Sequence, residues 1–258
     1  MGVACSAPSV FITGAASGIG RACALRFARA GWRLGLADRD GEGLKAVVTE
    51  LGLASIQPYV LDVSDGEAVR QALAGFCAER PLDVLVNNAG ILSVGKFSAL
   101  PLQRHQQIID VNVKGVIHCA HAAFPYLRPA RGVLINMSSA SAIFGTPDFA
   151  SYSASKFAVR GLTEALASEW RSEGVAVCDV LPPFVDTPML APHRGSSRLF
   201  ASMGVRLRAQ DVAEAVFRCT QRRRVHNPLT GPIRLFYSLA SLTPAWLQQR
   251  LMRVLSGH

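Results

Sequence analysis

The hydrophobic pattern of the chain alternates between two kinds of segment along most of its length. Short runs that are apolar throughout are typical of strands buried inside a parallel sheet. Longer stretches, in which apolar residues recur every three or four positions, predict amphipathic helices between them. The predicted strands span residues 9–13, 33–37, 56–61, 82–86, 132–137 and 175–181. The predicted helices span residues 18–30, 44–51, 67–79, 102–127 and 152–173.

Each parallel strand requires a crossover that returns the chain to the same end of the sheet, and a helix commonly supplies it. The pattern therefore predicts an α/β fold with a doubly wound parallel sheet of the Rossmann-like type. No stretch rich in proline or serine separates the predicted elements. We expect one main domain over residues 1–220.

The last part of the chain, residues 221–258, has a different pattern. Leu235, Leu239 and Leu242 share one face of a helix, and Pro244 begins a second helical segment. Hydrophobic residues of that second segment are Trp246, Leu247, Leu251, Met252 and Leu255. The region holds six arginines and no acidic residue. We expect two short, basic, amphipathic helices that form a C-terminal extension of the same domain.

Charge is distributed unevenly along the 258 residues. Half of the residues are hydrophobic and 17% are charged, which excludes a disordered chain and a small disulfide scaffold. The net charge is +9, and residues 187–258 account for all of it, with eleven arginines against Asp211 and Glu214. Because the positive charge is confined to one end, we expect no nucleic-acid partner.

The six cysteines are widely separated, and no Cys/His cluster has metal-ligand spacing. We therefore expect reduced thiols and no metal site. No basic leader opens the sequence, and no uncharged apolar run reaches about 18 residues, the length that spans a membrane. These observations favour a cytoplasmic protein.

A glycine-rich segment, Thr13–Gly20, follows the first predicted strand. Gly14 permits a tight turn, Gly18 lets the backbone approach a pyrophosphate, and Gly20 lets the helix pack closely on the strand. The free N–H groups at the start of the next helix favour phosphate. This pattern predicts a dinucleotide phosphate site formed by Gly14, Ser17, Gly18, Ile19 and Gly20.

Asp38 ends the second predicted strand, 18 residues after Gly20. An acidic residue at about this spacing binds the adenosine ribose hydroxyls of a dinucleotide. Its negative charge repels a 2′-phosphate, so NAD is favoured. Arg39 beside it could accept that phosphate, which leaves NADP open.

Tyr152 and Lys156 lie one helical turn apart, so both side chains project from the same face of a predicted helix. An unperturbed phenol has a pKa near 10, too high for a base at neutral pH. A neighbouring ammonium group and a cationic nicotinamide ring both lower that pKa. Ser139 follows the fifth predicted strand, where its hydroxyl can hydrogen-bond a substrate oxygen. We therefore interpret residues 1–220 as a dinucleotide-binding catalytic domain.

These features together resemble the short-chain dehydrogenase/reductase family, in its compact single-domain branch. The matching residues occur in the family's order over about residues 9–190, and they are Thr13–Gly20, Asp62, Val63, Asn87–Gly90, Asn112, Ser139, Tyr152 and Lys156. The resemblance implies a catalytic tetrad in which Asn112 holds a water that connects Lys156 to solvent. It also implies that Lys156 binds the nicotinamide ribose.

The resemblance further implies a set of cofactor contacts. Asp62 and the backbone of Val63 would bind adenine, Asn88 would line the adenosine side, and Ala89 and Gly90 would contact the cofactor ribose. After the sixth predicted strand, Thr187 and the backbone of Val185 would hold the nicotinamide carboxamide. The chain has Pro183 where the family usually has glycine, which removes a backbone donor and fixes φ in this turn.

The loop after the sixth strand offers Met189, Leu190, Leu199, Phe200 and Met203. These side chains suggest a small hydrophobic or lipid alcohol or ketone as substrate. Arginines among them, Arg194, Arg198, Arg206 and Arg208, could bind an acyl-carrier or coenzyme A phosphate, or form a solvated surface.

Two readings of the extension stay open. Residues 228–258 could contact an anionic membrane peripherally, with Trp246 at the interface, or cover the substrate cleft or a dimer interface. The family often pairs helices near residues 102–127 and 152–173, so we expect a homodimer or homotetramer. The predicted function is NAD(P)-dependent interconversion of a hydrophobic secondary alcohol and its ketone. Alternatives are an NADPH-dependent 3-oxoacyl-thioester reductase and a non-catalytic dinucleotide sensor.

Overall fold

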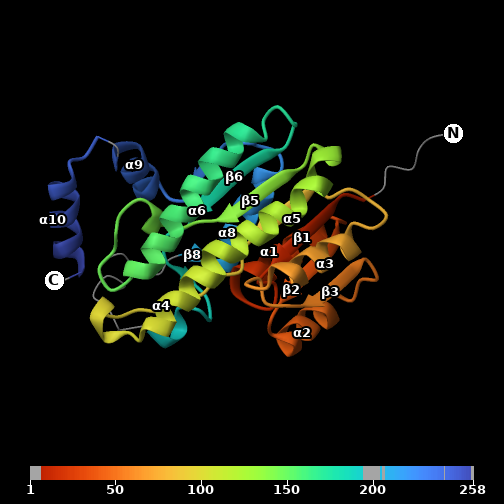
Figure 1. Cartoon of the computed structure of the whole chain (residues 1–258), viewed down its shortest axis with the longest axis horizontal. Coiled ribbons are helices and arrows are strands. Elements are labelled where there is room, and N and C mark those ends of the chain that lie inside the picture. Colours follow the sequence, from red (N-terminus) through yellow and green to blue (C-terminus); the bar gives the residue numbers. More distant parts are fainter. Residues whose placement is uncertain (1–6, 194–203, 205–206, 241, 257–258) are drawn as a thin grey trace.

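A computed structural model describes residues 7–193, 204, 207–240 and 242–256 of the chain. Seven parallel strands form a central sheet in the order β3-β2-β1-β4-β5-β6-β9, and helices cover both of its faces (Figure 1). The doubly wound α/β fold predicted from the sequence is confirmed. The strands of this sheet are β1 (Ser9–Thr13), β2 (Arg33–Asp38), β3 (Ile56–Val60), β4 (Val84–Asn87), β5 (Val133–Met137), β6 (Ala176–Leu181) and β9 (His226–Pro228).

The helices divide between the two faces of the sheet. The α-helices are α1 (Gly18–Arg29), α2 (Gly41–Leu51), α3 (Gly66–Phe76), α4 (Leu102–Ile109), α5 (Gly115–Ala130), α6 (Ala150–Glu169), α8 (Ala209–Cys219), α9 (Gly231–Ala240) and α10 (Ala245–Ser256). Shorter elements are η1 (Phe97–Ala99), η2 (Asp110–Lys114), η3 (Ala140–Ala142), η4 (Ala191–His193) and a two-stranded sheet of β7 (Val185–Asp186) and β8 (Leu207–Arg208).

Two hydrophobic cores lie on opposite faces of the sheet. One is built around Phe27 of α1 and Val216 of α8, which pack with inward residues of the central strands. The other is built around Phe76 of α3 and Leu127 of α5. Because both faces are covered, the central strands β1, β4 and β5 are buried at every position, which explains their continuous apolar runs, whereas the edge strand β3 is largely exposed.

The order of the strands reverses between β1 and β4, because β2 and β3 lie on one side of β1 and the later strands lie on the other. In open α/β sheets, ligands bind in the crevice outside the carboxyl ends of the strands at this reversal. Here those ends are Thr13 of β1 and Asn87 of β4. The topology therefore places the expected phosphate site at the mouth of this crevice.

Three features of the chain differ from the sequence-based expectation. The predicted helix over residues 102–127 is interrupted by the π-helical turn η2 between α4 and α5. Helix α8 was not predicted. Strand β9 was also not predicted, because its three residues His226-Asn227-Pro228 form no apolar run, yet it pairs in parallel with β6. The chain therefore returns to the main sheet inside the region assigned to the C-terminal extension.

The two helices expected at the C-terminus are present as α9 and α10. Ile233 of α9 packs with Ile143 and Leu181 next to the end of β6. Helix α10 lies farther from the sheet, at one end of the molecule (Figure 1). Among the described residues, no helix is both long enough and apolar enough to span a membrane.

Replacing Phe27 by alanine tests the core between α1 and α8. Phe27 is fully buried, and its ring contacts Trp32 at 4.9 Å and Phe217 at 5.2 Å between centroids. We expect Phe27→Ala to lower the free energy of unfolding by about 3–5 kcal/mol, because it leaves a cavity. Urea unfolding checks this, with Phe97→Ala, at a side chain that is 62% exposed, as the matched control. Equal losses in both variants would contradict the assignment of this core.

Candidate active site

The turn between β1 and α1 depends on backbone that only glycine adopts readily. Gly14 has φ of +67° and Gly18 has φ of +52°, both in the left-handed region. A Cβ atom on Gly20 would overlap the carbonyl oxygen of Gly14, and one on Gly14 would lie 2.8 Å from the Cα of Ala89. The glycines therefore allow α1 to begin directly against the ends of β1 and β4, with free backbone N–H groups at its start.

The end of β4 is tied to this turn by hydrogen bonds. The backbone N–H groups of Asn88 and Ala89 both donate to Thr13 Oγ1, at 3.1 Å each. The side-chain amide of Asn88 donates to the carbonyl oxygens of Thr13 and Gly14, at 3.0 and 3.1 Å. The hydrogen bonds of Thr13 and Asn88 thus fix the ends of β1 and β4, which form the two sides of the crevice.

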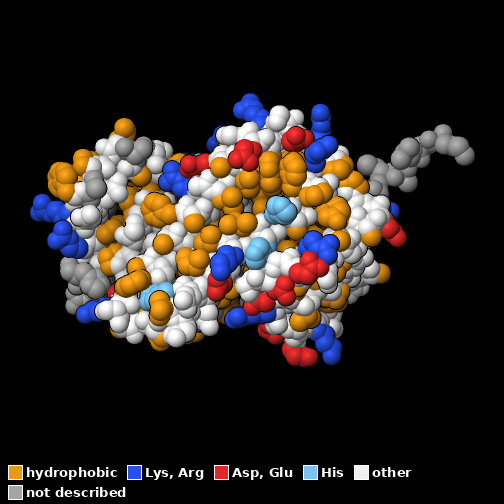
Figure 2. All heavy atoms as spheres, viewed as in Figure 1, with side chains coloured by type: hydrophobic (Ala, Val, Ile, Leu, Met, Phe, Trp, Pro, Cys, Tyr) orange, Lys and Arg blue, Asp and Glu red, His pale blue; other side chains and the backbone are white. Residues whose placement is uncertain are grey.

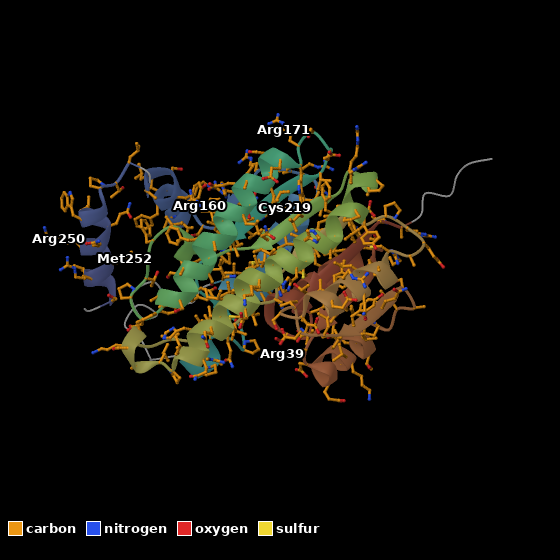
Figure 3. All side chains as sticks on the ribbon, viewed as in Figure 1. Arg39, Arg160, Arg171, Cys219, Arg250 and Met252 are labelled. Atoms are coloured by element: carbon orange, nitrogen blue, oxygen red, sulfur yellow. The ribbon has the colours of Figure 1, made fainter. Side chains whose placement is uncertain are left out.

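The carboxylate of Asp38 lies at the end of β2 and is held by backbone donors. Its Oδ2 accepts from Ala16 N at 2.9 Å, and its Oδ1 accepts from Asp40 N at 3.0 Å. Arg39 follows it and is exposed. Figure 3 shows Arg39 on the part of the molecule formed by β2 and α2, far from α10.

A cavity of about 430 Å³ lies over these groups at the carboxyl edge of the sheet. It brings together most of the residues predicted to contact a cofactor: Gly14, Ser17, Gly18, Ile19, Asp38, Arg39, Asp62, Val63, Asn88, Ala89, Gly90 and Thr187. Gly20 and Val185 are buried and do not line it. Residues not singled out from the sequence also line it, including Asp40, Ile91, Arg104, Pro192 and His193.

Arg104 and His193 could not have been recognised from the sequence, because neither belongs to a motif. Arg104 lies on α4, and its Nε donates to Ser93 Oγ at 2.7 Å. His193 ends η4, after β7. Of the loop residues expected to shape a substrate site, Arg194, Arg198, Leu199, Phe200, Met203 and Arg206 lie outside the described residues.

Asn112 is placed by the π-helical turn η2 and is fully buried. Its Oδ1 accepts from Ile91 N at 2.8 Å, and its Nδ2 donates to Ile91 O at 3.0 Å and to Ser155 Oγ at 3.1 Å. Ser155 lies on α6 and donates in turn to the carbonyl of Tyr152 at 2.6 Å. Asn112 therefore joins the segment after β4 to the helix that carries Tyr152 and Lys156. π-Helical turns inside α-helices often occur at functional sites.

Ser139, Tyr152 and Lys156 converge beside the carboxyl ends of β5 and β6. Tyr152 and Lys156 project from the first turns of α6, with the Lys156 ammonium 5.5 Å from the centre of the Tyr152 ring. The Ser139 hydroxyl makes a hydrogen bond with the Tyr152 side chain. Lys156 Nζ donates to Met137 O, the last carbonyl of β5, at 2.7 Å. These three residues do not line the 430 Å³ cavity itself.

Burial shifts both titratable groups away from their charged forms. It raises the pKa of Tyr152 to about 12, although the hydrogen bond with Ser139 offsets part of the rise. Burial also lowers the pKa of Lys156 to about 8. In the protein without ligand, Tyr152 is therefore a protonated phenol at neutral pH, suited to donate a proton to a carbonyl oxygen. To act as a base, it needs a further positive charge beside it.

The residues of the cavity fit a dinucleotide. The turn at Gly14 and Gly18 forms a cradle in which a side chain on Gly14 would clash, and the start of α1 supplies N–H groups for phosphate oxygens. Asp38 offers a carboxylate about where a ribose would lie. Acidic and amide side chains of Asp62 and Asn88 line the same space.

The sheet order, the glycine-dependent crevice and the Ser–Tyr–Lys convergence define the class of doubly wound α/β oxidoreductases. The family model described as short chain dehydrogenase matches residues 8–197. The chain therefore belongs to the short-chain dehydrogenase family, whose members are oxidoreductases that act on CH–OH groups.

The chain is also similar to individual members of the family. It is 37% identical over 182 residues to a 3-oxoacyl-[acyl-carrier-protein] reductase of Thermotoga maritima, a match that covers 69% of this chain and 74% of the relative. It is 40% identical over 193 residues to a galactitol 2-dehydrogenase (L-tagatose-forming) of Cereibacter sphaeroides, covering 73% and 76%. A short-chain dehydrogenase/reductase from Burkholderia phymatum, solved in complex with NAD, superimposes with a TM-score of 0.82 at 27% identity, covering 92% and 95%.

The lowered pKa of Lys156 predicts a pH dependence of stability. The lysine loses its proton near pH 8 in the folded protein and near its ordinary value of 10.5 in the unfolded chain. Between these values the unfolded chain binds more protons, so the free energy of unfolding rises with pH. From pH 8 to 10, we expect the wild type to gain about 2–3 kcal/mol relative to Lys156→Met.

Urea unfolding at several pH values measures this difference. Lys45→Met, at an exposed lysine of α2, is the control and should follow the wild type. If Lys156→Met and the wild type have parallel pH profiles, the lysine is not desolvated as described.

Proposed function

We propose that the protein interconverts a hydrophobic secondary alcohol and its ketone, with NAD(H) as the preferred dinucleotide. The observation that carries the proposal is the convergence of the Ser139 hydroxyl, the Tyr152 phenol and the Lys156 ammonium at the carboxyl edge of the sheet. A cavity of about 430 Å³ lies at the same edge of the sheet. Solved relatives contain NAD or NADP, which supports a nicotinamide dinucleotide as the cofactor, and the charge of Asp38 favours NAD.

In this proposal the dinucleotide lies along the crevice. The turn between β1 and α1 holds its phosphates. The residues that contact the phosphates or shape this turn are Gly14, Ser17, Gly18, Ile19 and Gly20. The adenosine half contacts Asp38, Arg39, Asp62, Val63 and Asn88. The nicotinamide half contacts Ala89, Gly90, Tyr152, Lys156, Val185 and Thr187. The position of Thr187 supports its contact with the nicotinamide half. A Cβ on Gly18 would lie 3.4 Å from the Thr187 side chain, so Gly18 and Thr187 lie on facing walls of the crevice.

A bound nicotinamide dinucleotide would supply a hydride acceptor for the alcohol carbon, or a hydride donor for the ketone carbon. Tyr152 moves the accompanying proton at the substrate oxygen, as acid or as base. Ser139 hydrogen-bonds the same oxygen and orients it. A protonated Lys156 stabilises the phenolate form of Tyr152.

Asn112 has a supporting role in this proposal. Its contacts with Ile91 and Ser155 hold the start of α6 against the end of β4. It thereby positions Lys156 and, through a water, connects that residue to solvent as a proton relay.

Apolar side chains around Tyr152 support a hydrophobic substrate. Leu92, Phe149 and Leu190 form a buried cluster against which Tyr152 and Phe184 pack. The wall of the substrate site near Tyr152 therefore offers few polar partners to a ligand. A substrate whose carbinol carbon carries apolar groups buries them at this wall.

A second candidate is a 3-oxoacyl-thioester reductase. The name of the Thermotoga maritima relative favours it. A 3-ketoacyl-(acyl-carrier-protein) reductase from Brucella melitensis was solved with NADH, so preference for NAD does not exclude this reaction. Comparing a free ketone with its thioester-carried form separates the two substrates: equal efficiency on both would exclude a role for the carrier's phosphate.

For partners and location, we propose a cytoplasmic homodimer or homotetramer. The apolar residues Leu102, Ile117 and Phe157 are 65%, 45% and 42% exposed on α4, α5 and α6, the helices through which we expect subunits to pair. Peripheral membrane contact through residues 228–258 is part of the same proposal, supported by the exposed apolar residues of α9 and α10.

Replacing Tyr152 by phenylalanine tests the catalytic role. We expect kcat to fall by about 100-fold or more, since the group that moves the proton is lost, while the affinity for NADH stays close to wild type. Nicotinamide absorbance reports turnover on a panel of alcohols and ketones, and NADH fluorescence reports binding. Tyr126→Phe is the matched control.

Undiminished turnover in Tyr152→Phe would refute the catalytic assignment. Binding of NADH without turnover of any alcohol or ketone by the wild type would favour a dinucleotide sensor instead.

Replacing Asp38 by asparagine tests the choice of dinucleotide. Removing this charge should raise kcat/KM for NADP relative to NAD by about tenfold, or about 1.4 kcal/mol. Asp40→Asn is a suitable control, because Asp40 lines the same cavity and asparagine also caps helices well. Arg39→Gln should lower use of NADP if this arginine accepts a 2′-phosphate. A wild type that already prefers NADP would overturn the assignment of NAD.

A further inference from the structure

A second cavity, of about 310 Å³, lies at the outer edge of the sheet, away from the crevice. It is lined by the end of α8, by strand β9 and by the start of α9, and it is open to solvent. Arg218 and Arg222 reach it from the end of α8 and the turn that follows, Arg224 from the approach to β9, and Arg234 from α9. No residue that lines the dinucleotide cavity also lines this one.

The charge of this arginine-lined cavity is unbalanced. Among the residues described by the structure, no Asp or Glu lines it. None of its four arginines forms a side-chain hydrogen bond or ion pair with another described residue, whereas Arg26, Arg70 and Arg160 elsewhere pair with glutamates. Several positive charges that share a concavity repel one another, so the cavity favours an anion.

Polar contacts hold the residues that form the floor of the cavity. His226 Nδ1 lies 3.0 Å from Asp179 Oδ1, and its Nε2 lies 3.3 Å from Glu164 Oε1. The side-chain amide of Asn227 donates to Asp179 O at 3.0 Å and to Arg224 O at 2.8 Å. Asp179 is fully buried, and its carboxylate contacts His226 rather than the arginines that line the cavity. These contacts hold the floor of the cavity in place, while the four exposed arginines keep their side-chain donors for a ligand.

We propose that the arginine-lined cavity binds the phosphate group of a phosphate-bearing ligand. Guanidinium groups present N–H donors in a planar fork that matches phosphate oxygens in pairs. A phosphate monoester carries up to two negative charges and three terminal oxygens, so it can accept from several arginines at once. A single carboxylate, with two oxygens, could accept hydrogen bonds from fewer of the four arginines.

The ligand can be a soluble phosphate or the headgroup of a membrane lipid. On α9, Leu235 follows Arg234 directly and is 60% exposed, and Leu239, one helical turn further on, is 44% exposed; Trp246 of α10 is 63% exposed. Figure 2 shows hydrophobic side chains beside arginines at the end of the molecule formed by α9 and α10. Figure 3 shows Arg250 on the side of α10 that faces away from the sheet. A lipid would use both the cavity and this apolar surface, and a soluble phosphate only the cavity.

Calorimetric titration with sodium pyrophosphate tests the soluble source. The titration is done with saturating NAD, which keeps pyrophosphate out of the crevice. The double variant Arg222→Gln/Arg234→Gln removes two charges from the cavity. Its control, Arg29→Gln/Arg171→Gln, removes two charges from exposed arginines outside both cavities. We expect affinity to fall at least about tenfold in the cavity variant and to be unchanged in the control.

Vesicle sedimentation tests the lipid source. Vesicles of phosphatidylcholine with phosphatidic acid are compared with vesicles of phosphatidylcholine alone, again for the wild type and both double variants. Binding to phosphatidic acid that is lost only in the cavity variant identifies a lipid phosphate, and pyrophosphate binding alone identifies a soluble ligand.

The proposal is overturned if the wild type binds neither probe, or if the two double variants bind equally. Both measurements compare variants of equal net charge, so they remain decisive even if the protein turns over no alcohol. Activity of the cavity variant should equal that of the wild type, since its arginines lie outside the crevice.

Discussion

The close approach of three backbone segments is the constraint on which the rest of the site depends. The turn after β1, the start of α1 and the end of β4 meet with no room for a side chain at Gly14 or Gly20. Thr13 and Asn88 then join the segments by hydrogen bonds. The crevice is therefore a result of packing, and the carboxylate of Asp38 is fixed against it by Ala16 N.

The chemical groups reach this crevice from the other half of the sheet. Helix α6 supplies both Tyr152 and Lys156, and two of its contacts lie beside them: Asn112 holds the helix through Ser155, and the end of β5 holds the Lys156 ammonium. The π-helical turn at Asn112 is what allows one side chain to contact both Ile91 and α6. A regular helix over residues 102–127 would present this side chain in a different direction.

The sequence predicted the parts of the molecule whose pattern is local. The apolar strands and the glycine turn have periodicities or residue types that point to one structure, and the Tyr152–Lys156 spacing needs only one helical turn. Strand β9 could not be predicted, because its pairing with β6 depends on contacts of Asn227 and His226 with Asp179, far away in the chain. Arg104 in the crevice and the arginines of the second cavity were missed as ligand-facing residues for the same reason: only the tertiary fold gathers them.

The hydrogen bond between Lys156 and the carbonyl of Met137 affects how the site recognises a ligand. A free lysine side chain loses about 2 kcal/mol of rotamer entropy when it is immobilised. Here the ammonium donates to the last carbonyl of a buried strand. The side chain therefore loses this entropy when the protein folds and not when a ligand binds. One of its three N–H donors points to the strand and two remain for oxygens that arrive later. The Lys156 side chain is therefore already ordered before a ligand binds. Binding at this end of the crevice then depends on the geometry of the ligand and costs little side-chain entropy of the lysine.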